Sequence, residues 1–485
     1  MTTVASDTFL RRVLKIEEIE NSKFLQAMYW ILLIGFVLAF REWMTNVQID
    51  RQAFLSGELI CPSYFRDCGL FYVLESLPRG SGIETLFAVL FGILTASALL
   101  AWQRRWDWAL ALLFPLVVFK LFYLYVLNYR SVVEYEYFHL PEVLVFLFAA
   151  RKEFFLRRVL VLTYLFAATM KFSEAWIVGS YFSVLQRGLP WFPDASIPFL
   201  TNAVVIFEIF APWALLSADR RWRWTALALW IGFHFYSLTL VGFNYPAYCI
   251  PLLLALFIPD PSPGELRTRF QREELAGGVI MVLIAIVSML PWWVPGNKEY
   301  SLQGRRFGVQ MFDANHQCLS QETTVTPDGK EDRRIVASNG AMRRCGPYTR
   351  LFGLQQTCRR QPGTRIEWLF LSSVNGHPFY EIVNVPDACA LNYSEFGLNE
   401  WMKFPETGAQ IRGYPEKNFV LMDGPAMGWK IVKPEPDPHQ RSAWQEPFEK
   451  IQGPLRILYW ALWWITLGFF AVRAWRHRAF AQKNL

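Results

Sequence analysis

The sequence predicts an α-helical polytopic membrane protein of about ten transmembrane segments, with a small β-rich extracytoplasmic domain inserted before the last helix. The first observation is composition: 53% of the 485 residues are hydrophobic and 17% are aromatic, which is unusual for a soluble chain of this length. The second is that these residues gather in long apolar runs, as membrane helices do. The third is the placement of arginine between the runs, where every second connection is basic.

Ten apolar segments follow a charged, amphipathic N-terminal stretch at residues 1–23. They lie near residues 24–40, 84–102, 107–127, 138–150, 155–172, 198–217, 224–242, 246–258, 275–293 and 456–474. A perpendicular membrane helix needs about 20 residues, so 138–150 and 246–258 are short and need not span fully. No small-residue cleavage site follows the first segment, so we expect it to be retained. We expect residues 24–293 to form one membrane domain, and residues 475–485 to form a basic tail.

The basic connections alternate with short connections that hold little more than Arg130 and Arg187. The basic group comprises Arg104, Arg105, Arg151, Lys152, Arg157, Arg158, Arg220, Arg221, Arg223, Arg267, Arg269, Arg272 and the tail residues Arg473, Arg476, Arg478 and Lys483. Because basic loops stay in the cytoplasm, we expect both termini there and residues 294–455 outside, most simply in a bacterial inner membrane. The net charge of +7 then belongs to loops that face the lipid bilayer, and it does not indicate a nucleic-acid partner.

The insert at residues 294–455 is polar and has alternating stretches at 365–372 and 379–385 with a turn signal, Asn375-Gly376, between them. This pattern predicts a β-rich domain. Six of the seven cysteines fall in regions predicted to lie outside, where disulfides persist. These are Cys61, Cys68, Cys318, Cys345, Cys358 and Cys389. We expect Cys61 and Cys68 to pair with each other or with the outer domain; the remaining connectivity is open, and buried free thiols are the alternative.

Several ionisable residues fall within the middle or outer half of the predicted spans, where a charge is costly. They include Lys171, His234, Glu208, Lys120 and His139. Each also has a structural interpretation. Lys171 can extend to the outer headgroups, His234 can be a hydrogen-bonded packing residue, and Glu208 can pair with Lys120.

Motifs of common soluble enzymes are missing from the sequence. It contains no glycine-rich phosphate loop, no HExxH and no nucleophile elbow. The histidines of the outer insert, His316, His377 and His439, lack the spacing of metal ligands. We therefore expect no metal cofactor.

The run 167–172 (AATMKF), followed by Trp176 and Gly179, resembles the active-site segment of the vitamin K-dependent γ-glutamyl carboxylases and their bacterial relatives, the HTTM-domain proteins. In that family a lysine is followed five residues later by tryptophan and three further on by glycine, and Lys171, Trp176 and Gly179 keep both spacings. The stretch 233–243, with His234 at its start, resembles the later histidine-bearing span of the family. A weaker match is 307–312 (FGVQMF), and the resemblance covers roughly residues 20–320.

The resemblance implies an enzyme with its site at the outer face. Lys171 would be the base that deprotonates vitamin K hydroquinone or menaquinol; the resulting anion reacts with O2 to give a strong base, which removes a glutamate γ-proton so that the carbanion captures CO2. His234 would assist by hydrogen bonding. Burial favours the neutral amine that such a base needs. The implied cofactor-binding residues are Trp176, Gly179, Glu208 and His139, and the implied partner is a secreted peptide or protein substrate.

Two other classes of function remain open. One is a non-catalytic membrane scaffold whose outer domain binds a partner protein. The other is a proton-coupled transporter that uses Glu208, Lys120 and His234 as relays, although the sequence shows no inverted repeat.

Overall fold

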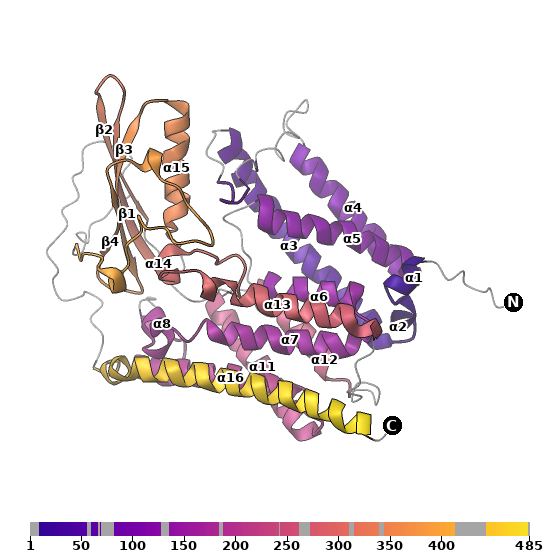
Figure 1. Cartoon of the computed structure of the whole chain (residues 1–485). Coiled ribbons are helices and arrows are strands. Elements are labelled where there is room, and N and C mark those ends of the chain that lie inside the picture. Colours follow the sequence, from indigo (N-terminus) through magenta and orange to yellow (C-terminus); the bar gives the residue numbers. More distant parts are fainter. Residues whose placement is uncertain are drawn as a thin grey trace.

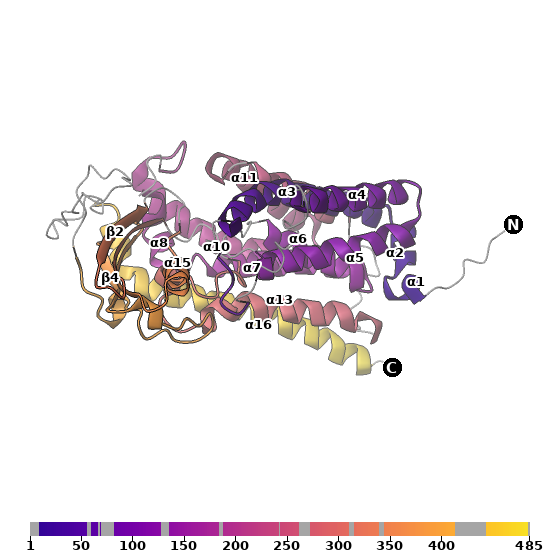
Figure 2. The same ribbon diagram turned by 90° about the horizontal axis from the view of Figure 1, so that it is seen from above.

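A computed structural model describes residues 9–55, 60–65, 68, 82–127, 135–183, 188–241, 243–260, 272–309, 315–338, 344–412 and 443–483. The chain is mostly helical, and a small antiparallel sheet stands at one end of the helical bundle (Figures 1 and 2). The expectations for Arg130, Arg187, Arg267, Arg269, His439, position 242 of the stretch 233–243, and residues 1–8, 310–312 and 484–485 lie outside the described residues.

The helical bundle is built from two successive sets of helices. The first set is α1 (Phe9–Val13), α2 (Ile16–Glu20), α3 (Lys23–Leu55), α4 (Gly82–Trp102), α5 (Trp106–Phe122) with its π-helical continuation η2 (Tyr123–Leu127), α6 (Glu136–Phe148), α7 (Lys152–Thr169), α8 (Glu174–Ile177) and α9 (Ser180–Ser183). The second set is η3 (Asp194–Ser196), α10 (Ile197–Leu215), α11 (Arg220–Val241), α12 (Asn244–Phe257), η4 (Arg272–Glu274) and α13 (Leu275–Trp293). The domain that carries the sheet is called the outer domain from here on, after its predicted location. After it, α16 (Glu446–Lys483) runs back along the bundle against α8 and α10 (Figure 1).

Five helical segments of the described chain are long and apolar enough to cross a membrane, which agrees with a membrane protein. They are Lys23–Asn46, Glu84–Trp102, Trp106–Leu127, Asp194–Leu215 and Leu275–Trp293. The predicted segments 138–150 and 246–258 correspond to the short helices α6 and α12. Among the other predicted spans, α7 begins with charged residues, yet from Val159 to Thr169 it is buried continuously between α6, α10, α12 and α13. A helix segment that is apolar all round belongs at the centre of a bundle.

The two ends of the bundle differ in their connections. At the end away from the sheet, where α1 and the end of α16 lie (Figures 1 and 2), segments that the sequence marks as basic connections meet one another. Ion pairs there join Lys15 to Glu273 (3.0 Å), Arg151 to Glu274 (2.9 Å) and Arg223 to Asp260. The described connections predicted to be basic therefore gather at one end of the molecule.

At the opposite end, the outer domain forms a four-stranded antiparallel sheet in the order β2-β1-β3-β4. The strands are β1 (His316–Val325), β2 (Glu331–Ser338), β3 (Arg365–Val374) and β4 (Tyr380–Val385), and helix α15 (Pro347–Arg360) packs against β3. The predicted strands 365–372 and 379–385 are confirmed as β3 and β4. The connection between them begins with a tight turn in which Asn375 and Gly376 have φ of 52° and 78° and the His377 N–H donates to the Val374 carbonyl (3.0 Å); positive φ at both central positions favours asparagine and glycine.

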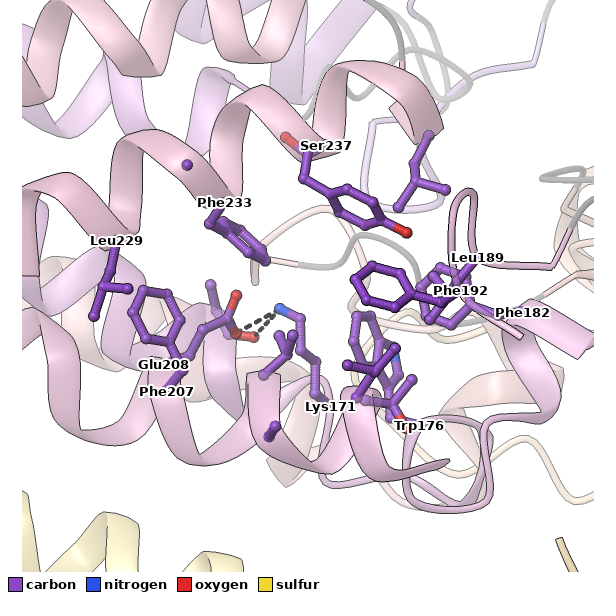
Figure 3. A pocket seen from close by; sticks show the side chains of 18 of the residues that line it. Lys171, Trp176, Phe182, Leu189, Phe192, Phe207, Glu208, Leu229, Phe233 and Ser237 are labelled. Carbon is purple, nitrogen blue, oxygen red and sulfur yellow. Dashed lines mark hydrogen bonds and ion pairs between the residues drawn. The ribbon is translucent and has the colours of Figure 1, made fainter. Parts of the chain in front are cut away.

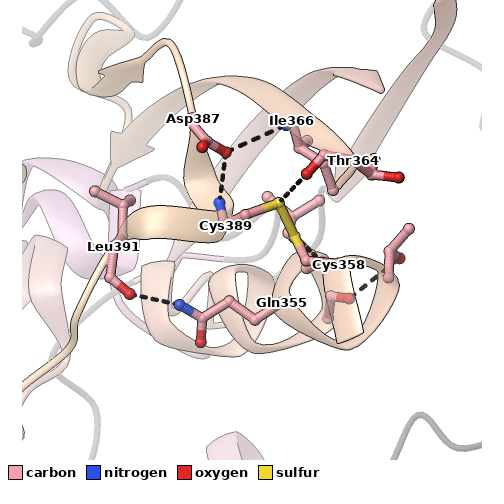
Figure 4. Close-up of a disulfide and its surroundings, with 10 residues drawn as sticks. Gln355, Cys358, Thr364, Ile366, Asp387, Cys389 and Leu391 are labelled. Carbon is pink, nitrogen blue, oxygen red and sulfur yellow. Dashed lines mark hydrogen bonds between the residues drawn. A yellow bond between two sulfur atoms is a disulfide. The ribbon is translucent and has the colours of Figure 1, made fainter. Parts of the chain in front are cut away.

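All six cysteines predicted to lie outside form disulfides: Cys61–Cys68, Cys318–Cys345 and Cys358–Cys389. The last one joins α15 to the turn η5 (Ala388–Ala390), where the Asp387 carboxylate accepts hydrogen bonds from the backbone N–H groups of Cys389 and Ile366 (Figure 4). Cys249 is a buried thiol in α12. The disulfides tie the helix of the outer domain to its sheet, and they close the loop that carries Cys61.

Candidate functional site

The chain breaks its helix where the lysine–tryptophan–glycine motif begins. Helix α7 ends at Thr169, and the Lys171 N–H donates to the Ala168 carbonyl (3.0 Å) in a tight turn. Trp176 lies on α8, and Gly179 follows α8 with φ of +77°. A Cβ at position 179 would lie 2.6 Å from the Ile197 side chain, so both the backbone conformation and the packing favour glycine there. The motif therefore directs the chain from α7 into a short helix beside α10.

Lys171 and Glu208 form a buried ion pair at this break. The Lys171 Nζ lies 2.6 Å from Glu208 Oε2 on α10 (Figure 3), and both residues are 3% exposed. The Lys171 Nζ also lies 5.0 Å from the centre of the Trp176 ring, within range of a cation–π interaction. The suggestion that Glu208 pairs with Lys120 is therefore wrong: Glu208 faces Lys171, whereas Lys120 on α5 lies 2.5 Å from Glu136 on α6.

A cavity of about 530 Å³, here called the lysine cavity, contains this pair in its wall. Its walls come from α7, α8, α9, residues 189–192, α10, α11 and the start of α12. They are almost entirely apolar. Besides Lys171 and Glu208, the lining residues are Tyr164, Ala167, Trp176, Tyr181, Phe182, Leu189, Phe192, Leu200, Thr201, Ala203, Val204, Phe207, Ala228, Leu229, Gly232, Phe233, Tyr236, Ser237, Leu240 and Tyr245. Leu229 is 54% exposed and Phe192 is 43% exposed. The cavity thus reaches the apolar outer surface of the bundle at α11.

His234 lies behind one wall of the lysine cavity. Its Nε2 is 2.6 Å from the hydroxyl of Tyr164, and Tyr164 lines the cavity and stacks on Trp230 with ring centres 3.9 Å apart. His234 itself does not line the cavity. It contacts the cavity wall through this hydrogen bond to Tyr164 and through ring contacts with Phe233 and Tyr245, whose ring centres lie 5.5 Å and 5.2 Å from its own.

His139 belongs to a different cluster, because its side of α6 faces α3 and α5. Its Nε2 lies 2.9 Å from the Leu32 carbonyl, and its Nδ1 contacts Lys120. A carbonyl only accepts, so Nε2 carries the hydrogen and Nδ1 accepts from the lysine. The expectation that His139 and Lys171 share one site is not met: His139 does not line the lysine cavity.

Of the aromatic residues that shape the cavity, sequence reasoning found Trp176 and missed Tyr164, Phe207 and Phe233. Tyr164 precedes Lys171 by seven residues, which is close to two turns of the helix predicted at 155–172 and therefore nearly the same side of it. Phe207 and Phe233 are the chain neighbours of Glu208 and His234. The spacing of Tyr164 from Lys171 was therefore a signal in the sequence. The positions of Phe207 and Phe233 gave no such signal, because aromatic residues occur throughout the apolar runs.

The outer domain holds the α8–α9 wall of the cavity. His377 Nε2, in the turn after β3, lies 2.8 Å from Glu174 Oε2 on α8. The Asn315 side-chain amide, just before β1, donates to the Tyr181 carbonyl on α9 (2.9 Å). The position of this wall therefore depends on the outer domain.

Helix α16 supports the same wall from the other side. The hydroxyl of Tyr459 lies 2.5 Å from Asn202 Oδ1 on α10, and the Asn202 Nδ2 donates to the Ile177 carbonyl on α8 (2.8 Å). Trp463 Nε1 donates to the Leu165 carbonyl on α7 (2.8 Å). One amide side chain thus joins three helices around the cavity.

We compared the chain with models of known protein families, with curated proteins and with solved structures, and none of the three comparisons found a match.

Proposed function

We propose that this chain is an integral membrane enzyme that binds a lipid-soluble quinol in the lysine cavity, and that it resembles the vitamin K-dependent γ-carboxylases in its chemistry. In this proposal about ten segments span a bacterial inner membrane, both termini are cytoplasmic and residues 294–455 lie outside. The gathering of basic connections at one end and of the disulfides in the outer loop and outer domain supports this orientation.

The observation that carries the proposal is a buried lysine–glutamate pair in the wall of an otherwise apolar cavity. Aromatic and aliphatic side chains such as Phe207, Phe233 and Leu240 offer surfaces for a planar ring and a prenyl chain. The exposed side chain of Leu229 marks a route from the bilayer. Lys171 and Glu208 provide the oppositely charged pair among the lining residues, where a ring hydroxyl can be recognised. The residues present therefore fit a quinol.

The chain's own residues can manage the first proton transfer. Proton transfer from the Lys171 ammonium to the Glu208 carboxylate produces a neutral amine and a neutral acid without changing the charge of the site. The Lys171 Nζ then takes the proton of a bound hydroxyl, while Glu208 keeps the one it received. The Trp176 ring lies 5.0 Å from the Lys171 Nζ, and the Tyr164 hydroxyl is hydrogen-bonded to His234. When bound, the quinol would supply the electrons that reduce O2 and, from that reaction, the strong base. That base would remove a γ-proton from a glutamate side chain of a secreted peptide, which would then take up CO2.

A non-catalytic scaffold is the second candidate. The same ion pair also favours it, because such a pair can have a purely structural role. Lys171 and Glu208 neutralise each other without any ligand, as a purely structural buried pair must. The outer domain would then bind the partner. The two proposals differ in whether the lysine cavity takes up a quinol.

Binding can be tested on the purified protein in nanodiscs with menadiol under anaerobic conditions, followed by quenching of tryptophan fluorescence. We expect saturable quenching by wild type, and its loss in Gly232→Phe, which fills the cavity from α11 where a Cβ meets no other atom within 4 Å. The control is Gly92→Phe on α4, where a Cβ likewise meets no atom within 4 Å. Equal, unsaturable quenching in all three proteins would contradict a quinol site and leave the scaffold.

A further inference from the structure

A second cavity, of about 350 Å³, lies between α6 and α13 and is called here the glutamate cavity. Helix α7 separates it from the lysine cavity, since Thr163 lines the glutamate cavity and Tyr164 lines the other. Apolar residues of α5, α6 and α13 form most of its wall. Two buried charged side chains also line it: Glu136 is 3% exposed and Arg306 is 5% exposed.

Glu136 presents an unused acceptor to this cavity. Its Oε2 lies 2.5 Å from the Lys120 Nζ, but its Oε1 has no hydrogen-bond partner within the described ranges. Nearby polar groups are already engaged: Thr163 Oγ1 donates to the Val159 carbonyl (2.9 Å), and Arg306 donates to the Leu124 carbonyl (2.5 Å). A buried carboxylate oxygen without a donor is unfavourable, so a donor on a ligand would be bound selectively at Oε1.

An aromatic roof closes the glutamate cavity toward the outer domain. Tyr125 stacks on Phe307 with ring centres 5.5 Å apart, and the Tyr64 hydroxyl donates to the Tyr125 carbonyl (2.7 Å). On the α13 side, by contrast, the lining residue Leu283 is 53% exposed. In the proposed topology this side faces lipid. A ligand would therefore enter from the bilayer with its polar group near the roof.

The charges around the cavity select a neutral ligand. Lys120 compensates Glu136, and Arg306 interacts electrostatically with Glu395 of the outer domain. A hydroxyl group suits such surroundings because it donates to a carboxylate without adding a charge of its own. We infer that the glutamate cavity is a second binding site, for a neutral lipid-soluble molecule that donates a hydroxyl group to Glu136 Oε1. This site is independent of any quinol in the lysine cavity.

The test uses the full-length protein in nanodiscs and a photoreactive probe, a hexadecanol that carries a diazirine in mid-chain. The matched control probe is its methyl ether, which has no hydrogen-bond donor. After irradiation, labelled peptides are mapped by mass spectrometry. We expect the alcohol to label α6 and α13 about tenfold more than the ether, the size expected for one hydrogen bond to a charged acceptor. Equal labelling by the two probes would overturn the inference.

A pair of α13 variants provides the structural control. Ser288→Phe fills the glutamate cavity, which Ser288 lines, and should abolish the preference for the alcohol. Val282→Phe adds the same kind of ring at a residue that is 58% exposed and outside the lining, and should keep it. The thermal midpoints of both variants report whether they fold. If the folded Ser288→Phe protein retained the preference, the site would lie elsewhere and the inference would fail.

Competition then identifies the source of the hydroxyl. Displacement of the alcohol probe by menadiol would assign the glutamate cavity to a quinol, and displacement by dioleoylglycerol would assign it to a glycerolipid. If neither competitor reduced labelling of α6 and α13, the proposed ligand class would be wrong.

Discussion

Lys171 and Glu208 meet in the wall of the lysine cavity with 2.6 Å between Nζ and Oε2, although 37 positions separate them in the chain. The lysine comes from the turn after α7 and the glutamate from α10. Both are buried, so each charge depends on the other for compensation. This relationship makes the pair the most informative place to separate a catalytic role from a structural one.

Lys171→Ala and Lys171→Arg should both abolish quinol-dependent turnover, because neither side chain can accept a proton from a bound hydroxyl; arginine remains protonated in proteins. The measurement is menadiol oxidation by O2, together with incorporation of labelled CO2 into a glutamate-containing peptide, by purified variants. Lys403→Arg, on the exposed surface of the outer domain, is the control and should behave as wild type. Equal, non-zero rates for wild type and Lys171→Arg would end the claim that this lysine is a base.

Lys171→Met should destabilise the protein by about 3–5 kcal/mol, because it leaves a buried carboxylate without its partner. The double variant Lys171→Met/Glu208→Leu should recover most of this loss, since it replaces the pair by apolar groups. Thermal unfolding in detergent measures both effects as shifts of the midpoint. A double variant no more stable than Lys171→Met would show that the two residues are not energetically coupled.

A cysteine introduced at Glu331, on exposed β2, should react with an impermeant maleimide while the cytoplasmic membrane is intact. A cysteine at Asp219, in the exposed turn before α11, should react only after that membrane is opened. The opposite pattern would invert the proposed topology. The native cysteines give little background because six are paired and Cys249 is buried.

Tyr459→Phe should lower the free energy of unfolding by about 1–3 kcal/mol, because it leaves the buried side-chain oxygen of Asn202, Oδ1, without the hydroxyl donor from α16. It should also weaken menadiol binding, since Asn202 holds the α8 wall of the lysine cavity. Trp464→Phe, a change on the 54% exposed side of the same helix, is the control for both measurements. Unchanged stability and binding in Tyr459→Phe would assign α16 a role outside this wall.

Burial raises the pKa of Glu395 above its usual value of 4.5, although hydrogen bonds from Gly304, Tyr393 and Ser63 oppose the shift. The folded state therefore keeps this proton to higher pH than the unfolded state does, and stability contributed by the protonated carboxyl is lost as pH rises through the folded-state pKa. Glu395→Gln cannot ionise, so its stability relative to wild type should increase as pH is raised from below 4.5 toward neutral. Thermal midpoints of the two proteins across this range provide the test, and a constant difference would refute it.

Local patterns predicted several elements closely, and five helical segments of the described chain are long and apolar enough to cross a membrane. The predicted segment 275–293 coincides with α13, and 84–102 differs from α4 by two residues at its start, because hydropathy and turn residues act over a few neighbouring positions. The strands at 365–372 and 379–385 were predictable for the same reason. The motif of Lys171, Trp176 and Gly179 was also visible, since its residues lie within one turn and one short helix.

Partner choice was beyond these patterns. His139 and His234 look alike in sequence, each a single histidine in an apolar run, yet one contacts Lys120 and the other Tyr164. Glu208 was equally able, by position, to pair with Lys120 or Lys171. Which group an intramembrane side chain meets depends on the rotation of its helix, about 100° for each residue, and on which helices pack beside it. Those quantities are set by contacts between residues distant in the chain, so only the packed bundle brought Lys171 to Glu208 and gave their cavity its aromatic walls.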